Sequence, residues 1–74
     1  FEKWRIDACK EHILDILRIP GFIYPKNWIL SQLLNTGWGF TEREAKEALD
    51  SFTRQGILKY NEKIDSYELN NLHE

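Results

Sequence analysis

The sequence has few of the residues on which disulfides and metal sites are built. It contains one cysteine, Cys9, two histidines and no methionine. A single cysteine cannot form an internal disulfide, so the fold does not depend on an oxidising compartment. Cys9 and His12 are spaced like two metal ligands on a helix, but only His73 is left as a further ligand, and structural zinc needs four. We expect a buried Cys9 and no metal or cofactor.

The motifs of common catalytic sites are also missing. There is no glycine-rich phosphate loop, no HExxH and no CxxC. Ser31 and Ser51 have no obvious general base, because His12 and His73 are the only histidines. A substrate pocket of several hundred cubic ångströms is also hard to fit into so small a core. We therefore expect neither enzyme activity nor a small-molecule substrate.

Neither basic nor acidic residues are in large excess. Ten lysines and arginines face twelve aspartates and glutamates, for a net charge of −2 and a pI of about 5.7. The strongest indication of a nucleic-acid or membrane-surface partner, a large basic excess, is therefore lacking. No apolar run approaches the ~20 residues that span a bilayer, and no signal-peptide pattern opens the chain. We expect a cytoplasmic location and no membrane partner.

The chain does have the apolar content of one small domain. Its 74 residues are 42 % hydrophobic and 14 % aromatic, which excludes disorder. A second domain does not fit, so we expect a single domain over 1–74 with a core of about 4–70. The polar end, 69–74, predicts a fraying terminus, with 71–74 outside the core. Because the chain begins at Phe1 without methionine, we expect a piece of a longer protein.

Two amphipathic helices are predicted in the first half. The first covers 3–18 and ends before Pro20, since proline cannot continue a helix. The β-branched and aromatic residues of 21–24 predict a short strand. Pro25 suits the first position of a second helix, which stops at 35–37. The residues predicted to be buried are Ile6, Cys9, Ile13, Leu14, Ile16 and Leu17 in the first helix and Ile29, Leu30, Leu33 and Leu34 in the second.

A capping box marks the start of a third helix at Glu42. Thr41 and Glu44 are three residues apart, so each side chain can satisfy the other's free backbone N–H. The turn Gly37-Trp38-Gly39 precedes the box, and Gly56 is a natural left-handed C-cap. The residues expected on the inner side, including the hydrophobic-staple pair Phe40 and Ala45, are Phe40, Ala45, Ala48, Leu49 and Phe52.

After Gly56 the apolar period changes to two, which predicts a β-hairpin. Leu58 and Tyr60 point one way and Ile57 and Lys59 the other. The polar segment 61–65 supplies the turn. The second strand repeats the alternation, with Tyr67 and Leu69 on one side and Ser66 and Glu68 outward.

This order of elements, a helix, a short strand, two helices and a hairpin, resembles a winged helix. The stretch 44–60, which runs from the capped helix through Gly56 into the hairpin, is similar to the third helix and first wing strand of winged helix-turn-helix regulators. The resemblance covers about 21–70, with the helix at 3–18 as support. It implies an α+β fold in which a three-helix bundle carries a short strand and a C-terminal β-hairpin wing.

The resemblance also implies that the third helix (42–55) enters the DNA major groove and that the wing (57–70) touches the backbone. The sequence departs from a strong DNA binder, because 41–56 carries three basic and four acidic residues. Glutamate can nevertheless read cytosine, and arginine guanine. Our leading hypothesis is duplex DNA binding, as part of a regulator or replication-type protein. The DNA-binding residues would be Arg43, Lys46, Glu47, Asp50, Ser51 and Arg54 on the helix and Lys59 and Lys63 on the wing.

A competing interpretation is that these helix charges only pair with one another. Glu42/Lys46, Arg43/Glu47 and Asp50/Arg54 each lie four residues apart, the spacing of ion pairs within a helix.

Three tryptophans support an alternative function. Trp4 and Trp28 lie off the apolar stripes of their helices, and Trp38 lies in a turn. If exposed, they would anchor a protein partner or a second copy of the chain, or, in the case of Trp38, a nucleotide base; otherwise they would belong to the core. The alternative is a winged helix used for protein contact without nucleic-acid binding. Two exposed tryptophans on one face would favour it, whereas buried tryptophans, with Arg43 and Arg54 free of acidic neighbours, would favour DNA.

Overall fold

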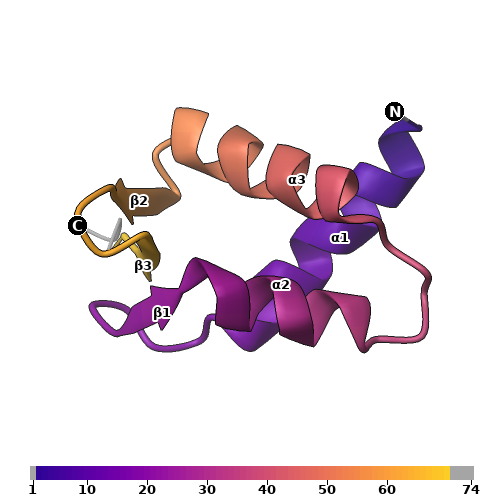
Figure 1. Cartoon of the computed structure of the whole chain (residues 1–74). Helices are drawn as coiled ribbons and strands as arrows, with labels where there is room; N and C mark the ends of the chain where they lie inside the picture. Colours follow the sequence, from indigo (N-terminus) through magenta and orange to yellow (C-terminus); the bar gives the residue numbers. More distant parts are fainter. Residues whose placement is uncertain (1, 71–74) are drawn as a thin grey trace.

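Three helices and a three-stranded antiparallel sheet make up the structure, a computed structural model that describes residues 2–70 (Figure 1). Along the chain they are α1 (Lys3–Ile16), β1 (Ile23–Pro25), α2 (Lys26–Leu34), α3 (Glu42–Arg54), β2 (Leu58–Asn61) and β3 (Ser66–Leu69). β3 is the middle strand, between β1 and β2. This α+β arrangement is compatible with the winged-helix layout. His73 and the tail predicted over 71–74 lie outside the described residues.

The core lies where the three helices meet one another and the sheet. In Figure 1, α1 crosses behind α2 and α3, and both of these helices contact it. The buried aliphatic and aromatic residues form one continuous cluster. The largest fully buried side chains are Ile13, Leu17, Ile29, Leu33, Leu49 and Leu58.

α1 is two residues shorter than predicted. Leu17 leaves the helical conformation with φ −94° and ψ 81°, and its N–H closes the last turn on the Ile13 carbonyl. Leu17 is nevertheless buried, as predicted. The prediction for Leu14 is wrong, because that side chain is exposed. Ile16, at the edge of the stripe, does pack against the core.

The strand before α2 is shifted from its predicted place. Gly21 has φ +83° and forms part of a turn, so the strand starts later than predicted. Pro25 is the last strand residue and the N-cap of α2, not its first helical residue. The next N–H, that of Lys26, donates to the Asp65 carbonyl of the neighbouring chain segment at 3.0 Å. Position 25 therefore directs its nitrogen away from β3, where a proline loses no ladder bond.

α2 buries a narrower stripe than predicted. Ile29, Leu30 and Leu33 are buried, but Leu34 is 47 % exposed, so the prediction for Leu34 is wrong. Leu34 follows Leu30 by four residues and thus continues the stripe. It lies at the end of the helix, however, where the chain turns away at Asn35.

α3 agrees with its prediction in detail. It begins at Glu42, and both capping-box bonds are present. The Glu44 N–H donates to Thr41 Oγ1 at 3.1 Å, and the Thr41 N–H donates to Glu44 Oε1 at 2.9 Å. Gly56 follows the helix with φ +79°, a conformation that glycine adopts without strain. All the predicted inner residues are buried: Phe40, Ala45, Ala48, Leu49 and Phe52.

The β-hairpin is present, with small differences at its ends. Leu58 pairs with Leu69, so position 69 belongs to the sheet and not to a fraying terminus. Asn61 is the last residue of β2, which leaves 62–65 as the turn. Ser66, predicted to point outward, is buried because β3 is covered by a strand on each side; its hydroxyl donates to the Ile64 carbonyl.

Candidate nucleic-acid interface

The side of α3 that faces solvent carries a stripe of charge. Arg43, Glu47, Asp50 and Arg54 follow one another at spacings of four, three and four residues, which places them on one line along the helix. Lys46 and Ser51 flank this line. The stripe has an arginine at each end and two carboxylates between them, opposite the buried side of the helix.

The ion pairs on α3 only partly follow the predicted spacing. Lys46 Nζ lies 3.9 Å from Glu42 Oε2, as predicted. Arg54 Nη2 lies 3.4 Å from Glu47 Oε2, two turns back, in place of the predicted pair with Asp50. Arg43 also interacts within the molecule. The pairs of Lys46 and Arg54 are well exposed, so a ligand can displace them at little cost.

A hollow of about 300 Å³ separates α3 from the hairpin. Lys46 and Asp50 of α3 line one side of it, and Tyr60 and Tyr67 of the hairpin line the other. Lys26, at the first position of α2, also borders it. Nothing in the sequence pattern of α2 distinguishes Lys26, because only the folded chain brings it next to the hairpin. The hollow therefore has a lysine on each of two helices.

Asp65 holds the hairpin against the start of α2. Its Oδ1 accepts a hydrogen bond from the Tyr60 hydroxyl at 2.5 Å and lies 3.4 Å from Lys26 Nζ. Its carbonyl accepts the Lys26 N–H, and its φ of +51° orients both groups. The Tyr60 hydrogen bond lowers the pKa of Asp65 and raises the pKa of Tyr60. These contacts fix the hairpin turn against the start of α2.

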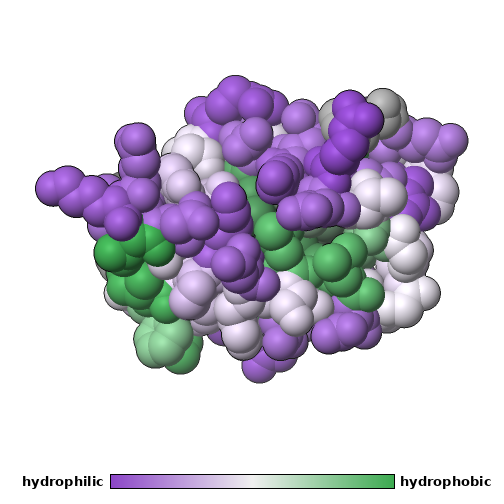
Figure 2. All heavy atoms as spheres, in the orientation of Figure 1, coloured by the Kyte–Doolittle hydropathy of each residue, from purple (hydrophilic) through white to green (hydrophobic). Residues whose placement is uncertain are grey.

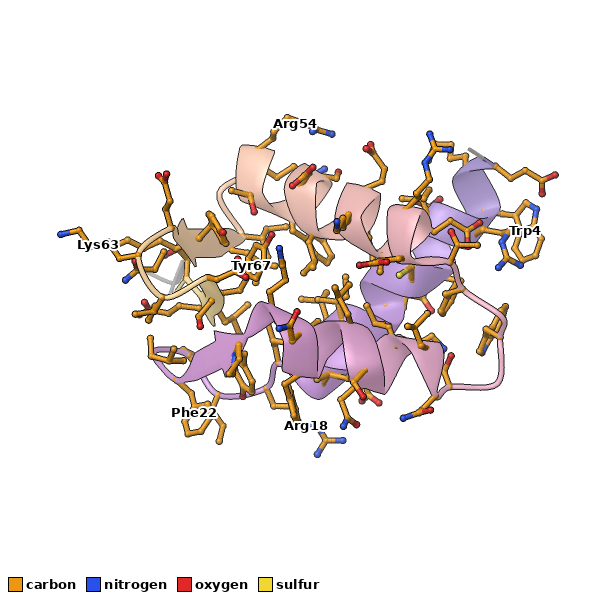
Figure 3. All side chains as sticks on the ribbon, viewed as in Figure 1. Trp4, Arg18, Phe22, Arg54, Lys63 and Tyr67 are labelled. Carbon is orange, nitrogen blue, oxygen red and sulfur yellow. The ribbon has the colours of Figure 1, made fainter. Side chains whose placement is uncertain are left out.

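The two lysines of the hairpin, Lys59 and Lys63, are exposed, as their predicted role in backbone contact requires. Lys59 lies on β2, across from Glu68 of β3. Lys63 lies in the hairpin turn and projects outward, whereas Arg54 lies along the outer side of α3 (Figure 3). The predicted DNA-binding residues thus cover a broad surface and do not converge on one pocket. Such a surface suits a large, extended ligand.

All three tryptophans are exposed, and two of them lie at one end of the molecule. Trp4 is 57 % and Trp38 47 % exposed. The Arg5 guanidinium lies 5.6 Å from the ring centres of both Trp4 and Phe40, and Trp38 stacks on Phe40 at 5.8 Å. We call Trp4, Arg5, Trp38 and Phe40 the aromatic end. It lies at the opposite end of the molecule from the hairpin (Figures 1 and 3).

Trp28 belongs to a separate apolar surface beside β1. Its ring, 42 % exposed, stacks on Tyr24 at 5.6 Å between ring centres. Tyr24 in turn contacts Phe22 at 4.9 Å. Together with Ile23 and Pro25 these rings line an apolar hollow of about 400 Å³. Figure 2 shows a hydrophobic patch at this end of the molecule, over β1 and the turn before it.

An ion pair that the sequence pattern did not indicate joins α1 to the start of α3. Arg5 Nε donates to Glu44 Oε2 at 2.6 Å, and Arg5 Nη2 donates to Glu44 Oε1 at 3.0 Å. The same Nη2 reaches the Gly39 carbonyl at 2.9 Å. The bonds from Arg5, followed by the bond from the Thr41 N–H, lower the pKa of Glu44 to about 2. Glu44 is therefore both a cap of α3 and the anchor of Arg5.

The cysteine and histidine of α1 have structural surroundings. Cys9 is buried, as predicted, and burial raises the pKa of its thiol to about 11, which leaves it unreactive at neutral pH. His12 packs edge-on against Trp38 and Phe40. Within residues 2–70 no three histidine, cysteine or carboxylate side chains are grouped as metal ligands. No helix in this part of the chain has the length and apolar character needed to cross a membrane.

Comparison with known proteins gives no relative. No protein-family model matches the chain, and neither a curated protein nor a solved structure matches it.

Proposed function

We propose that this domain is a winged helix that binds duplex DNA through the exposed face of α3 and the β2–β3 hairpin, as part of a regulator or replication-type protein. One observation carries the proposal: α3 and the hairpin line the same hollow, with Lys46 and Asp50 on the helix side and Tyr60 and Tyr67 on the hairpin side. The strand order β1-β3-β2 and the Asp65 contacts tie the hairpin to β1 and α2, and β2 also contacts α3. In this arrangement the helix would lie in the major groove and the wing on the backbone.

The lysines of this surface suit phosphate contacts. Lys26 and Lys46 line the hollow between α3 and the hairpin, and Lys59 and Lys63 line a second hollow on the hairpin. Lysine is a compact point charge that binds phosphate without a fixed geometry. The carboxylates of the α3 stripe, Glu47 and Asp50, oppose general attraction to phosphate. This mixture of lysines and carboxylates favours sequence-specific DNA binding over nonspecific DNA binding.

An NMR titration with a mixed-sequence duplex tests the proposal. We expect shifts in 42–55 and 59–66 and at Lys26. If four lysines neutralise phosphates, raising the salt fourfold should weaken binding roughly a hundredfold. The variant Lys63→Ala should reduce this salt dependence, whereas the matched variant Lys3→Ala, in the exposed pair with Asp7 on α1, should not. A spectrum that stays unchanged at low salt would refute DNA binding.

A second function, protein contact, is favoured by the two features expected of it from the sequence: Trp4 and Trp38 are both exposed at the aromatic end, and Arg54 is paired with the acidic Glu47. Exposed tryptophan and arginine side chains are typical anchors of protein interfaces. In this alternative the domain contacts protein through the aromatic end, away from the hairpin, and does not bind nucleic acid. The partner would be another protein or a second copy of the chain.

The separation of the two surfaces can be measured in the same titration. Adding duplex DNA should leave the indole N–H resonances of Trp4 and Trp38 in place, because neither side chain lies on the α3 and hairpin surface. If both indole N–H resonances shift with the same dependence on DNA concentration as the α3 resonances, this expectation is wrong and the aromatic end belongs to the DNA interface.

A further inference from the structure

The ion pair between Arg54 and Glu47 presents a donor next to an acceptor on the exposed stripe of α3. Its contact, Nη2 to Oε2 at 3.4 Å, uses one nitrogen and one oxygen. A guanidinium has five N–H groups in a planar fork, and a carboxylate has two oxygens. The pair therefore keeps a two-pronged donor on Arg54 and an acceptor, Oε1, on Glu47 while the two side chains stay together.

The major-groove edge of a C·G base pair is the complement of this arrangement. Guanine offers two acceptors, O6 and N7, and the cytosine beside it offers the N4 amino donor. We propose that Arg54 and Glu47 together read one C·G base pair, with Arg54 donating to guanine O6 and N7 and Glu47 accepting from cytosine N4. This inference rests on the proposed DNA binding and names the base pair that the surface selects.

Other base pairs fit the ion pair less well. Adenine places an amino donor beside its N7 acceptor, so the fork of Arg54 would meet one acceptor and one donor. The thymine opposite offers an acceptor and a methyl group, which leaves Glu47 without a donor. A carboxylate that enters the groove without a hydrogen bond loses its hydration and gains nothing. The acidic residue that weakens general DNA binding thus becomes the source of discrimination.

The position of the pair on α3 supports a role in base contact. Arg54 and Glu47 lie on the central line of the exposed face, whereas Lys46 lies beside that line, toward the hollow. Arg54 lies on the outer side of α3, and its side chain runs back along the helix toward Glu47 (Figure 3). A helix in the major groove presents its central line to the bases and its flanks to the phosphates. The lysines therefore contact the backbone and the Arg54–Glu47 pair faces the base edges.

Selection of binding sites from a random duplex library tests this inference. We would compare the unmodified chain with Glu47→Ala and Arg54→Ala, and use Glu11→Ala and Arg18→Ala on the α1 side as controls with the same change of charge. The selected duplexes should share a C·G pair at one position. Replacing that pair by A·T should weaken binding tenfold or more for the unmodified chain and for both controls.

Each α3 variant should lose most of this tenfold preference at that one position. Glu47→Ala should also bind unrelated duplexes more tightly, because it removes a negative charge from the groove. If selection yields bound duplexes whose C·G preference survives in both α3 variants, the Arg54–Glu47 inference is wrong while DNA binding stands. If no duplex is bound even at low salt, the proposed function itself fails, and the inference fails with it.

Discussion

Replacing Leu33 with alanine is expected to lower the free energy of unfolding by about 2–5 kcal/mol, whereas the same change at its neighbour Leu34 should cost less than about 1 kcal/mol. Leu33 is completely buried in the core, and Leu34 is 47 % exposed. The Leu33 variant loses the transfer energy of its side chain and leaves a cavity among packed residues. Small domains have stabilities near the low end of 5–15 kcal/mol, so this variant should be largely destabilised at 37 °C.

Urea unfolding followed by circular dichroism measures both variants under identical conditions. The slope of the free energy against urea should stay that of the unmodified chain, because the surface exposed on unfolding hardly changes. Leu33 and Leu34 are neighbouring residues of the same type on the same helix, so the two variants differ mainly in the burial of the side chain that is removed. Equal losses for the two variants would show that α2 does not present the buried face found in the structure.

The local signals of the sequence predicted the helices better than the boundaries between them. The capping box of Thr41 and Glu44 involves four consecutive residues and an unambiguous pair of hydrogen bonds, so α3 starts where it was predicted to start. The strand before α2 was misplaced because its extent depends on pairing with β3, more than 40 residues away along the chain. Periodicity alone also could not show that Leu14 and Leu34 lie beyond the area that other elements cover.

In the candidate site, too, local sequence patterns identified some residues and missed those that only tertiary contacts bring into place. The stripe residues of α3 were identified because their positions opposite Ala45 and Leu49 follow from helical spacing alone. Lys26 was missed, since only the contact of α2 with Asp65 of the hairpin turn brings it to the hollow. Arg5 was missed for a similar reason. Its partner Glu44 is 39 residues away, and the local pattern already gave Glu44 a complete role as a cap.

The ion pair of Glu44 with Arg5 should make the stability of the domain sensitive to acid. The pKa of Glu44 is about 2 in the folded chain, against an ordinary value near 4.5, chiefly because Arg5 donates two hydrogen bonds to it. A carboxyl whose pKa is lowered by folding stabilises the fold fully above its unfolded pKa and loses this contribution as pH falls toward the folded pKa. The contribution of Glu44 should therefore be constant near neutral pH and disappear between about pH 4.5 and pH 2.

The variant Glu44→Gln isolates this effect, because it keeps the shape of the side chain and removes its charge. At pH 7 it should be clearly less stable than the unmodified chain, since Arg5 is left without a counter-charge near the α3 terminus. Below pH 4 the two stabilities should converge, and the unmodified chain should take up close to one more proton on unfolding than the variant does.

The matched variant Glu11→Gln, which removes an exposed carboxylate from α1, should stay close to the unmodified chain at pH 7. Urea unfolding at a series of pH values gives all three curves. If the gap between Glu44→Gln and the unmodified chain is the same at pH 7 and pH 3, the Arg5–Glu44 pair does not control the acid stability of the domain.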